Sequence, residues 1–220
     1  MRNETSFAAT IRRRWHVLLP LLAVVGTAHA QSLSGKNLVQ ALQGGGYVIL
    51  MRHASSPRTP PDTAHAQPDN VTHERQLDDE GHSTARAMGA ALRQLRIPIG
   101  QVLSSPTYRA LETIRLAQLG TPKVDAQLGD LGQSMQADFS GTRATWLRQK
   151  VAQKPPASGN TIIVTHFPNI NEAFAGYAAG LGDGEALIFH PDGHGPAAFV
   201  GRVKIQQWPQ LATTYSRQRE

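Results

Sequence analysis

The chain has 220 residues and no cysteine, which excludes disulfides, a thiol nucleophile and thiolate metal sites. Aromatic residues make up only 6% of it and no basic stripe with interleaved aromatic residues occurs, so the composition argues against nucleic-acid binding. The net charge is +6, and the first 30 residues carry half of it, with four arginines and one glutamate.

Residues 1–30 have the pattern of a secretory signal peptide. Three arginines at 12–14 form a positive region, an apolar stretch covers 17–25, and Ala28-His29-Ala30 supplies small residues at the positions that a signal peptidase reads. The apolar stretch contains Pro20 and is too short to span a bilayer as an uncleaved anchor. We therefore expect cleavage after Ala30, no stable membrane insertion afterwards, and a periplasmic or secreted protein; the pattern leaves both the general and the twin-arginine export routes open.

The rest of the chain, residues 31–220, has the length of one domain with its own core. Apolar and β-branched runs that predict strands alternate with segments of helical periodicity. In chain order we expect a helix at 36–43, a strand at 47–52, a helix at 78–96, a strand at 101–104, a helix at 105–120, a weak strand at 122–124, a helix at 140–153, a strand at 161–165, a helix at 171–179, and a hairpin of strands at 186–190 and 198–205. The polar tail after Trp208 is expected to be loose. This alternation predicts a three-layer α/β/α sandwich with a mostly parallel central sheet.

Two of the predicted strands are followed directly by histidine, His53 in one case and His166 in the other. The carboxyl ends of neighbouring strands in an open α/β sheet face one crevice, where ligands bind. Arg109 falls in the first turn of the helix after strand 101–104, so it can point into the same crevice, and the free N–H groups of that helix start favour an anion. This combination predicts a site for a phosphoryl group.

The residue types suit phosphoryl transfer through a covalent intermediate. Neutral His53 can attack phosphorus if its other ring nitrogen donates to a fixed acceptor. Arg52 and Arg109 can grip phosphate oxygens in pairs, and His166, if protonated, would stabilise charge on those oxygens. A carboxylic acid must protonate the leaving oxygen and later activate water. Because cationic side chains can replace a divalent metal here, we expect neither a metal nor a cofactor.

Four blocks, in family order, resemble the histidine phosphatase superfamily of phosphoglycerate mutase-like phosphatases. The blocks are Arg52-His53, Glu74 to Gly81, Ser104 to Thr113 and Val164-Thr165-His166. They span about residues 47–190, and their order makes the resemblance specific. The resemblance implies a phosphoglycerate mutase-like fold, phosphorylation of His53, and a phosphate pocket completed by Arg52, Arg109 and His166.

Two positions depart from the family pattern, and the proton donor is open. Ala54 and Phe167 stand where glycine is usual; the first could narrow the approach, and the second could wall off one side of the pocket and alter specificity. Three carboxyl groups are candidates for the donor: Asp130, which follows Leu128-Gly129; Glu185, just before a late strand; and Glu74, in the long loop.

The expected function is an exported phosphomonoesterase that acts on a phosphorylated small molecule or an envelope glycolipid. The export signal and the short chain are similar to a phosphatase of lipopolysaccharide core heptose phosphate, whereas His166-Phe167-Pro168 is similar to the small bacterial phosphohistidine phosphatases. A phosphohistidine or phosphoprotein phosphatase and a catalytically inactive anion-binding scaffold are the alternatives.

Two further interpretations stay open at this point. Arg75 either steers the phosphate of the substrate or pairs with a local acid. A zinc site would draw on loop residues, but their spacing matches no zinc signature. These residues are Asp62, His65, Asp69, His73 and His82.

Overall fold

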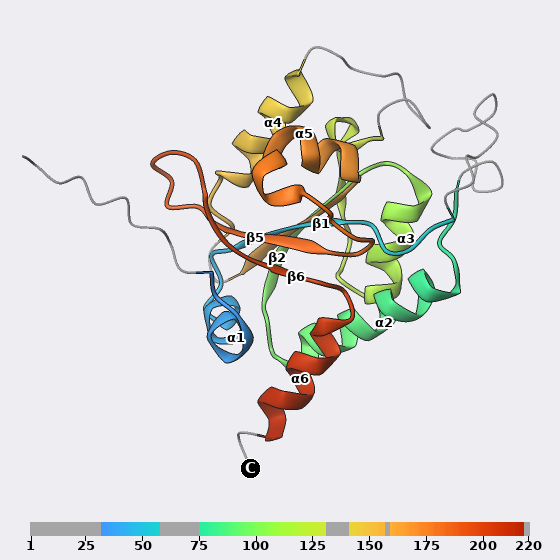
Figure 1. Ribbon diagram of the computed structural model, residues 1–220, viewed down its shortest axis with the longest axis vertical. Helices are drawn as coiled ribbons and strands as arrows, with labels where there is room; N and C mark the ends of the chain where they lie inside the picture. The colour runs from blue at the N-terminus through green and yellow to red at the C-terminus, as the bar shows by residue number, and fades with distance from the viewer. Residues whose placement is uncertain (1–31, 58–74, 131–140, 157–158, 218–220) are drawn as a thin grey trace, which may run out of the picture.

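A six-stranded sheet forms the centre of the protein, with the strand order β3-β2-β4-β1-β5-β6 (Figure 1). The computed structural model describes residues 32–57, 75–130, 141–156 and 159–217. The strands are β1 (Val48–Arg52), β2 (Ile99–Ser104), β3 (Lys123–Val124), β4 (Asn160–Thr165), β5 (Ala186–His190) and β6 (Ala198–Val203). The strands from β3 to β1 in this order pair in parallel, whereas β5 runs antiparallel to β1, and β6 antiparallel to β5.

Helices cover both faces of the sheet. They are α1 (Gly35–Gln43), α2 (Asp79–Gln94), α3 (Tyr108–Ala117), the 3-10 turn η1 (Ala126–Leu128), α4 (Thr142–Val151), α5 (Phe167–Ala178) and α6 (Gln207–Arg217). Helices α4 and α5 pack on one face, and α1, α2, α3 and α6 contribute to the core on the other. The predicted three-layer α/β/α fold with a mostly parallel sheet is thus confirmed.

The central strand β1 is apolar because it is buried on both faces. Val48 and Leu50 pack in the core beneath α4 and α5, whereas Ile49 and Met51 pack in the core on the opposite face. All four side chains are at most 2% exposed. Burying such a side chain stabilises the fold by roughly 1.5–3 kcal/mol, so both cores anchor the strand that leads to His53.

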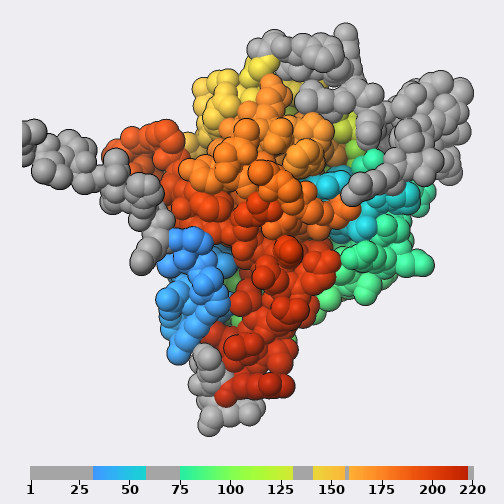
Figure 2. Space-filling view, viewed as in Figure 1, coloured from blue at the N-terminus to red at the C-terminus, as the bar shows by residue number. Residues whose placement is uncertain are grey.

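The prediction of a loose tail after Trp208 is wrong. This segment forms α6, which packs against α2 and α1. Figure 2 shows α6, in red, on the surface between the blue α1 and the green part of the chain. Trp208 and Ala212 are each 1% exposed, and Leu211 and Tyr215 pack against the same core. Spacings of three, four and seven residues place these four side chains on one helical face, which fixes the polar segment to the domain.

The starts of two other helices differ from the prediction. Helix α3 begins at Tyr108, with Thr107 as its N-cap residue, and not at residue 105. Helix α5 begins at Phe167, immediately after His166, with a proline in its first turn. Proline is well tolerated there because the first N–H groups of a helix have no partner within it.

The N-terminal segment lies outside the described residues, so the signal peptide stays a prediction. In the part of the chain that the structure describes, no helix is both long enough and apolar enough to cross a membrane.

Candidate active site

Strand pairing brings the two histidines together. Arg52 of β1 pairs in register with Thr165 of β4, and the His53 amide donates to the Thr165 carbonyl over 3.0 Å. The residue that follows each of these positions is a histidine, so His53 and His166 leave the sheet side by side. Their ring centroids are 5.2 Å apart, and each residue is 2% exposed. The predicted convergence of the two histidines is therefore present.

The hydrogen bonds of His53 select one tautomer of its ring. Nδ1 lies 2.8 Å from the Ala54 carbonyl oxygen, which can only accept, so Nδ1 carries the proton. Nε2 lies 3.2 Å from Nε of Arg109, which can only donate, so Nε2 presents its lone pair. His53 therefore has the fixed acceptor that a nucleophilic imidazole requires, and the free lone pair is on Nε2.

The hydrogen bonds of His166 select the opposite tautomer. Its Nδ1 accepts from Nη2 of Arg109 at 3.2 Å, so the proton is on Nε2. That N–H lies 2.8 Å from the Ser105 hydroxyl oxygen and 3.3 Å from that of Thr107. Both residues follow β2, whose carboxyl end lies beside that of β4.

Arg109 connects the two histidines to a carboxylate. Its Nη2 lies 2.5 Å from Oδ2 of Asp130, and both side chains are at most 4% exposed. Its Nη1 is buried and has no hydrogen-bond partner among the described residues. Leaving a buried charged donor without a partner is costly, which suggests that this N–H group serves an anion.

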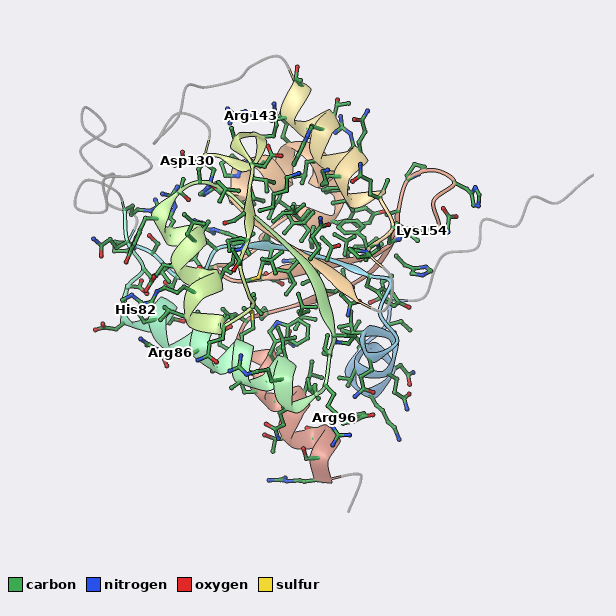
Figure 3. All side chains as sticks on the ribbon, turned by 180° about the vertical axis from the view of Figure 1, so that it is seen from behind. His82, Arg86, Arg96, Asp130, Arg143 and Lys154 are labelled. Carbon is green, nitrogen blue, oxygen red and sulfur yellow. The ribbon has the colours of Figure 1, made fainter. Side chains whose placement is uncertain are left out.

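The backbone that carries Asp130 is held by α5 and β4. The Thr165 hydroxyl donates to the Leu128 carbonyl at 2.7 Å, and the Asn169 amide donates to the Gly129 carbonyl at 2.7 Å. Figure 3 shows Asp130 and Arg143 close together at this end of the molecule, and Arg143 also donates to the Gly129 carbonyl. Asp130 is thus placed by contacts from three elements.

Burial keeps both imidazoles neutral. It lowers the pKa of His53 well below its ordinary value, and the charge of Arg109 lowers it further. Burial also lowers the pKa of His166, again with help from Arg109. His166 is therefore a neutral acceptor for Arg109, and it becomes a cation only if a bound anion offsets the cost of burial.

These side chains surround a small cavity with a volume of about 170 Å³. Its walls are Arg52, His53, Arg75, Arg109, Asp130, His166, Phe167 and Pro168. Arg75 is half-buried, and burial together with the charges of Arg109 and Arg52 lowers its pKa to about 10. The three arginines thus repel one another around one cavity, an arrangement that a multiply charged anion would relieve.

Arg52 contacts an acid that the sequence analysis did not select. Its Nη2 lies 2.6 Å from Oδ1 of Asp183, in the turn before β5. The antiparallel pairing of β5 with β1 brings this turn to the carboxyl end of β1. Ser105 and Thr107 were also missed as partners of His166. Their place just after β2 could have indicated that they lie near His166. Asp183 could not be found in this way, because the sequence does not show that β5 pairs with β1.

The structure does not bring Glu185 to the cavity, so it does not support the prediction that Glu185 donates the proton. Its carboxylate accepts from Arg202 at 3.0 and 2.8 Å and from the Gly182 amide at 2.8 Å. Burial raises the pKa of Glu185, but the hydrogen bonds from Arg202 and Gly182 outweigh it, so the pKa is lowered. Glu74 lies outside the described residues, which leaves Asp130 as the carboxyl group found in the cavity walls.

The two departures from the family pattern have different outcomes. Ala54 is 0% exposed, packs in the core and is not part of the cavity wall, so its methyl group does not narrow the approach. Its amide donates to the Thr113 hydroxyl of α3, which in turn donates to the Arg109 carbonyl at 2.7 Å. Phe167 does form part of the wall, as expected.

Most residues of the zinc interpretation, from Asp62 to His73, lie outside the described residues. Among the residues that are described, no group of three or more histidine or acidic side chains is placed to hold a metal ion. His82, in the first turn of α2, is not part of the cavity wall and lies apart from Asp130 in Figure 3.

The fold and the site together define a class: an α/β protein with two buried histidines and an arginine around an anion-sized cavity at the carboxyl ends of parallel strands. Residues 48–132 match the family model of the histidine phosphatase superfamily (branch 1). This stretch contains β1 with Arg52 and His53, and also Arg109 and Asp130. No curated protein matches the sequence.

Solved structures show the same fold at low sequence identity. The protein histidine phosphatase SixA, solved as a complex with tungstate, is 18% identical; the match covers 73% of this chain and 98% of SixA, with a TM-score of 0.51. Phosphoglycerate mutase from Bacillus anthracis str. Sterne is 14% identical; that match covers 79% of this chain and 99% of the mutase, with a TM-score of 0.52. Residues 48–132, less than half of the chain, therefore resemble branch 1 of the histidine phosphatase superfamily, and the solved structures show a similar fold.

Proposed function

We propose that the protein is a phosphomonoesterase that works through a phosphohistidine intermediate on Nε2 of His53. The observation that carries this proposal is the contact of Arg109 with that atom. It leaves His53 neutral, with the lone pair on Nε2 and with the proton on Nδ1, which donates to the Ala54 carbonyl. A neutral, oriented imidazole beside donors for phosphate oxygens is what nucleophilic attack on phosphorus requires.

In the first step Nε2 of His53 forms a bond to phosphorus, and the bond from phosphorus to the ester oxygen breaks. The phosphoryl group replaces Asp130 as a partner of Arg109, so Asp130 can take up a proton from solvent and then give it to the leaving oxygen. Arg109 holds phosphate oxygens through its fork, including the buried Nη1–H group, while Arg52 and Arg75 add positive charge. When the anion binds, His166 loses the hydrogen bond from Arg109 and takes up a proton from solvent, which it returns when phosphate leaves.

In the second step a water molecule attacks phosphorus on the side that the leaving group has vacated. The water gives a proton to the Asp130 carboxylate, and the bond between phosphorus and Nε2 breaks, with its electron pair returning to His53. Inorganic phosphate leaves and the original protonation states are restored.

We also propose that the protein is exported and acts in the periplasm or outside the cell, on a phosphorylated small molecule or an envelope glycolipid. Export rests on the signal-like pattern of residues 1–30. The cavity has a volume of about 170 Å³, which favours a substrate whose phosphoryl group enters the cavity while the rest of the molecule stays outside.

The test is phosphatase activity of protein purified after expression of the full-length chain, compared with His53→Ala and with His194→Ala. His194 is an exposed histidine in the turn between β5 and β6 and serves as the matched control. We expect the His53 variant to lose activity by at least about 10³-fold, the His194 variant to keep it, and vanadate to inhibit the wild type.

Substrate preference is read from a panel of phosphosugars, phosphopeptides and phosphohistidine. A preference for phosphohistidine would favour the protein phosphatase alternative. Equal turnover by the wild type and the His53 variant would contradict the mechanism, and vanadate binding without turnover would favour the anion-binding scaffold. Residue 31 as the first residue of the periplasmic protein would support export, whereas a start at Met1 would contradict cleavage.

A further inference from the structure

Asp183 is a partly buried acid next to the cavity that the proposed mechanism does not use. Its side chain is 25% exposed and that of Arg52 is 18% exposed, and Oδ1 of Asp183 lies 2.6 Å from Nη2 of Arg52. Arg52 lines the cavity, but Asp183 does not. Asp183 lines a different cavity, so it contacts Arg52 without forming part of the wall around the proposed phosphoryl site.

The turn that carries Asp183 is tied to the end of β1 on both sides. The Gly184 amide donates to the His53 carbonyl at 2.9 Å, and the Arg52 amide donates to the Glu185 carbonyl at 3.1 Å. Gly184 has φ +66, and a Cβ atom there would lie 2.6 Å from the Ile205 side chain. The position of Asp183 relative to His53 is thus set by backbone contacts that only this turn conformation allows.

A second ion pair holds the same turn from its other side. Glu185 accepts from the Gly182 amide at 2.8 Å, which closes the turn around Asp183. Arg202 of β6 donates to Glu185 and also to the Ala179 carbonyl, at 2.9 Å. The Glu185 side chain thus supports the turn.

Arg52 needs such an anchor because its neighbours repel it. Arg75 and Arg109 line the same small cavity, and burial together with the charges of Arg109 and Arg52 lowers the pKa of Arg75. A long arginine side chain at the end of a strand also loses rotamer entropy when it is fixed in one conformation. An opposite charge on its outer side offsets both effects.

We propose that Asp183 is a positioning residue that holds the guanidinium of Arg52 in the cavity wall, ready for phosphate oxygens. This inference rests on the proposed function of the same site. The turn before β5 would thus contribute to anion binding by fixing Arg52, which the two histidines at the strand ends do not do. Asp183 acts through Arg52 and does not touch the substrate.

The experiment measures vanadate binding by calorimetry, together with kcat and KM for p-nitrophenyl phosphate, for Asp183→Asn in full-length protein. Asparagine keeps the size of the side chain and removes its charge. We expect vanadate to bind roughly tenfold more weakly and KM to rise more than kcat falls. Asp192→Asn, at an exposed acid in the turn after β5, is the control and should match the wild type.

The same substitution is repeated in an Arg52→Lys background. Lysine keeps the charge but lacks the planar fork, so we expect removal of Asp183 to change vanadate affinity by less than about twofold there. An equal loss in both backgrounds would show a general effect on the fold and would overturn the inference. Tighter vanadate binding by Asp183→Asn would also overturn it, because Asp183 would then merely compete with the anion.

Measuring vanadate binding and ester turnover separately distinguishes failure of the proposed phosphatase function from failure of the proposed role of Asp183. If the wild type binds vanadate but turns over no ester, the proposed function fails, while the coupling between Asp183 and Arg52 still decides the inference. If turnover depends on His53 but Asp183→Asn binds vanadate as the wild type does, the inference alone fails.

Discussion

Nε of Arg109 lies 3.2 Å from Nε2 of His53, so a buried cation donates a hydrogen bond to the proposed attacking atom. This contact stabilises the neutral ring and disfavours a proton on Nε2. In the proposed mechanism an incoming phosphoryl group replaces this contact, because the N–H group then has a phosphate oxygen as a better acceptor. Arg109 would thus hold His53 in its neutral tautomer before the anion binds and grip the phosphate oxygens afterwards.

Arg109→Lys is expected to lower kcat/KM for p-nitrophenyl phosphate by about 10²–10³-fold, because lysine keeps the charge but cannot contact both histidines and phosphate oxygens. Steady-state kinetics measures the loss, and circular dichroism checks that the variant is folded. Arg115→Lys is the control on the same helix, since that side chain is 68% exposed and pairs with Glu112. Wild-type kinetics for Arg109→Lys would show that charge alone suffices.

Stability is expected to fall as the pH drops below about 6.5, the ordinary pKa of an unfolded histidine. Burial and Arg109 lower the pKa values of His53 and His166, so the unfolded chain binds more protons than the folded protein in this range. Each histidine then contributes a slope of up to about 1.4 kcal/mol per pH unit, until the pH reaches its lowered pKa in the folded protein.

Urea unfolding at pH 6.5 and 5.5 measures this slope. His166→Asn should reduce it, whereas His194→Asn, at an exposed histidine, should leave it unchanged. A His166 variant with the full wild-type slope would show that the buried imidazole is not the source of the pH dependence.

Two matched acid-to-amide substitutions separate the remaining candidates for the proton donor. Asp130→Asn should lower kcat by about 10²–10⁴-fold, because an amide can neither give nor take the proton. Glu185→Gln should keep kcat within about threefold but lower the free energy of unfolding by about 1–3 kcal/mol, since Arg202 loses a charged partner. A large fall in kcat for Glu185→Gln without loss of stability would reverse the assignment.

The core of the site could be predicted because it depends on strand periodicity and parallel topology. His53 and His166 follow apolar strands, and Arg109 follows a third, so the general geometry of α/β sheets places them together. The segment 207–217 was mispredicted because its polar composition obscured an apolar face built from few residues. Asp183 was missed and Glu185 misplaced because strand order and direction around β1 arise from tertiary packing. Asp183 and Glu185 are only two residues apart, yet Asp183 pairs with Arg52 of β1 and Glu185 with Arg202 of β6, because β5 lies between these two strands.

The reversed direction of β5 has a consequence for the assembly of the protein. Because β5 runs antiparallel to β1, Asp183, which contacts Arg52 at the end of β1, lies just before the start of β5. Both histidines are made earlier in synthesis than this turn and than the Arg202 that supports it. A chain truncated before this turn would carry both imidazoles yet lack Asp183, so full anion affinity would arise only after the turn and the final hairpin have docked.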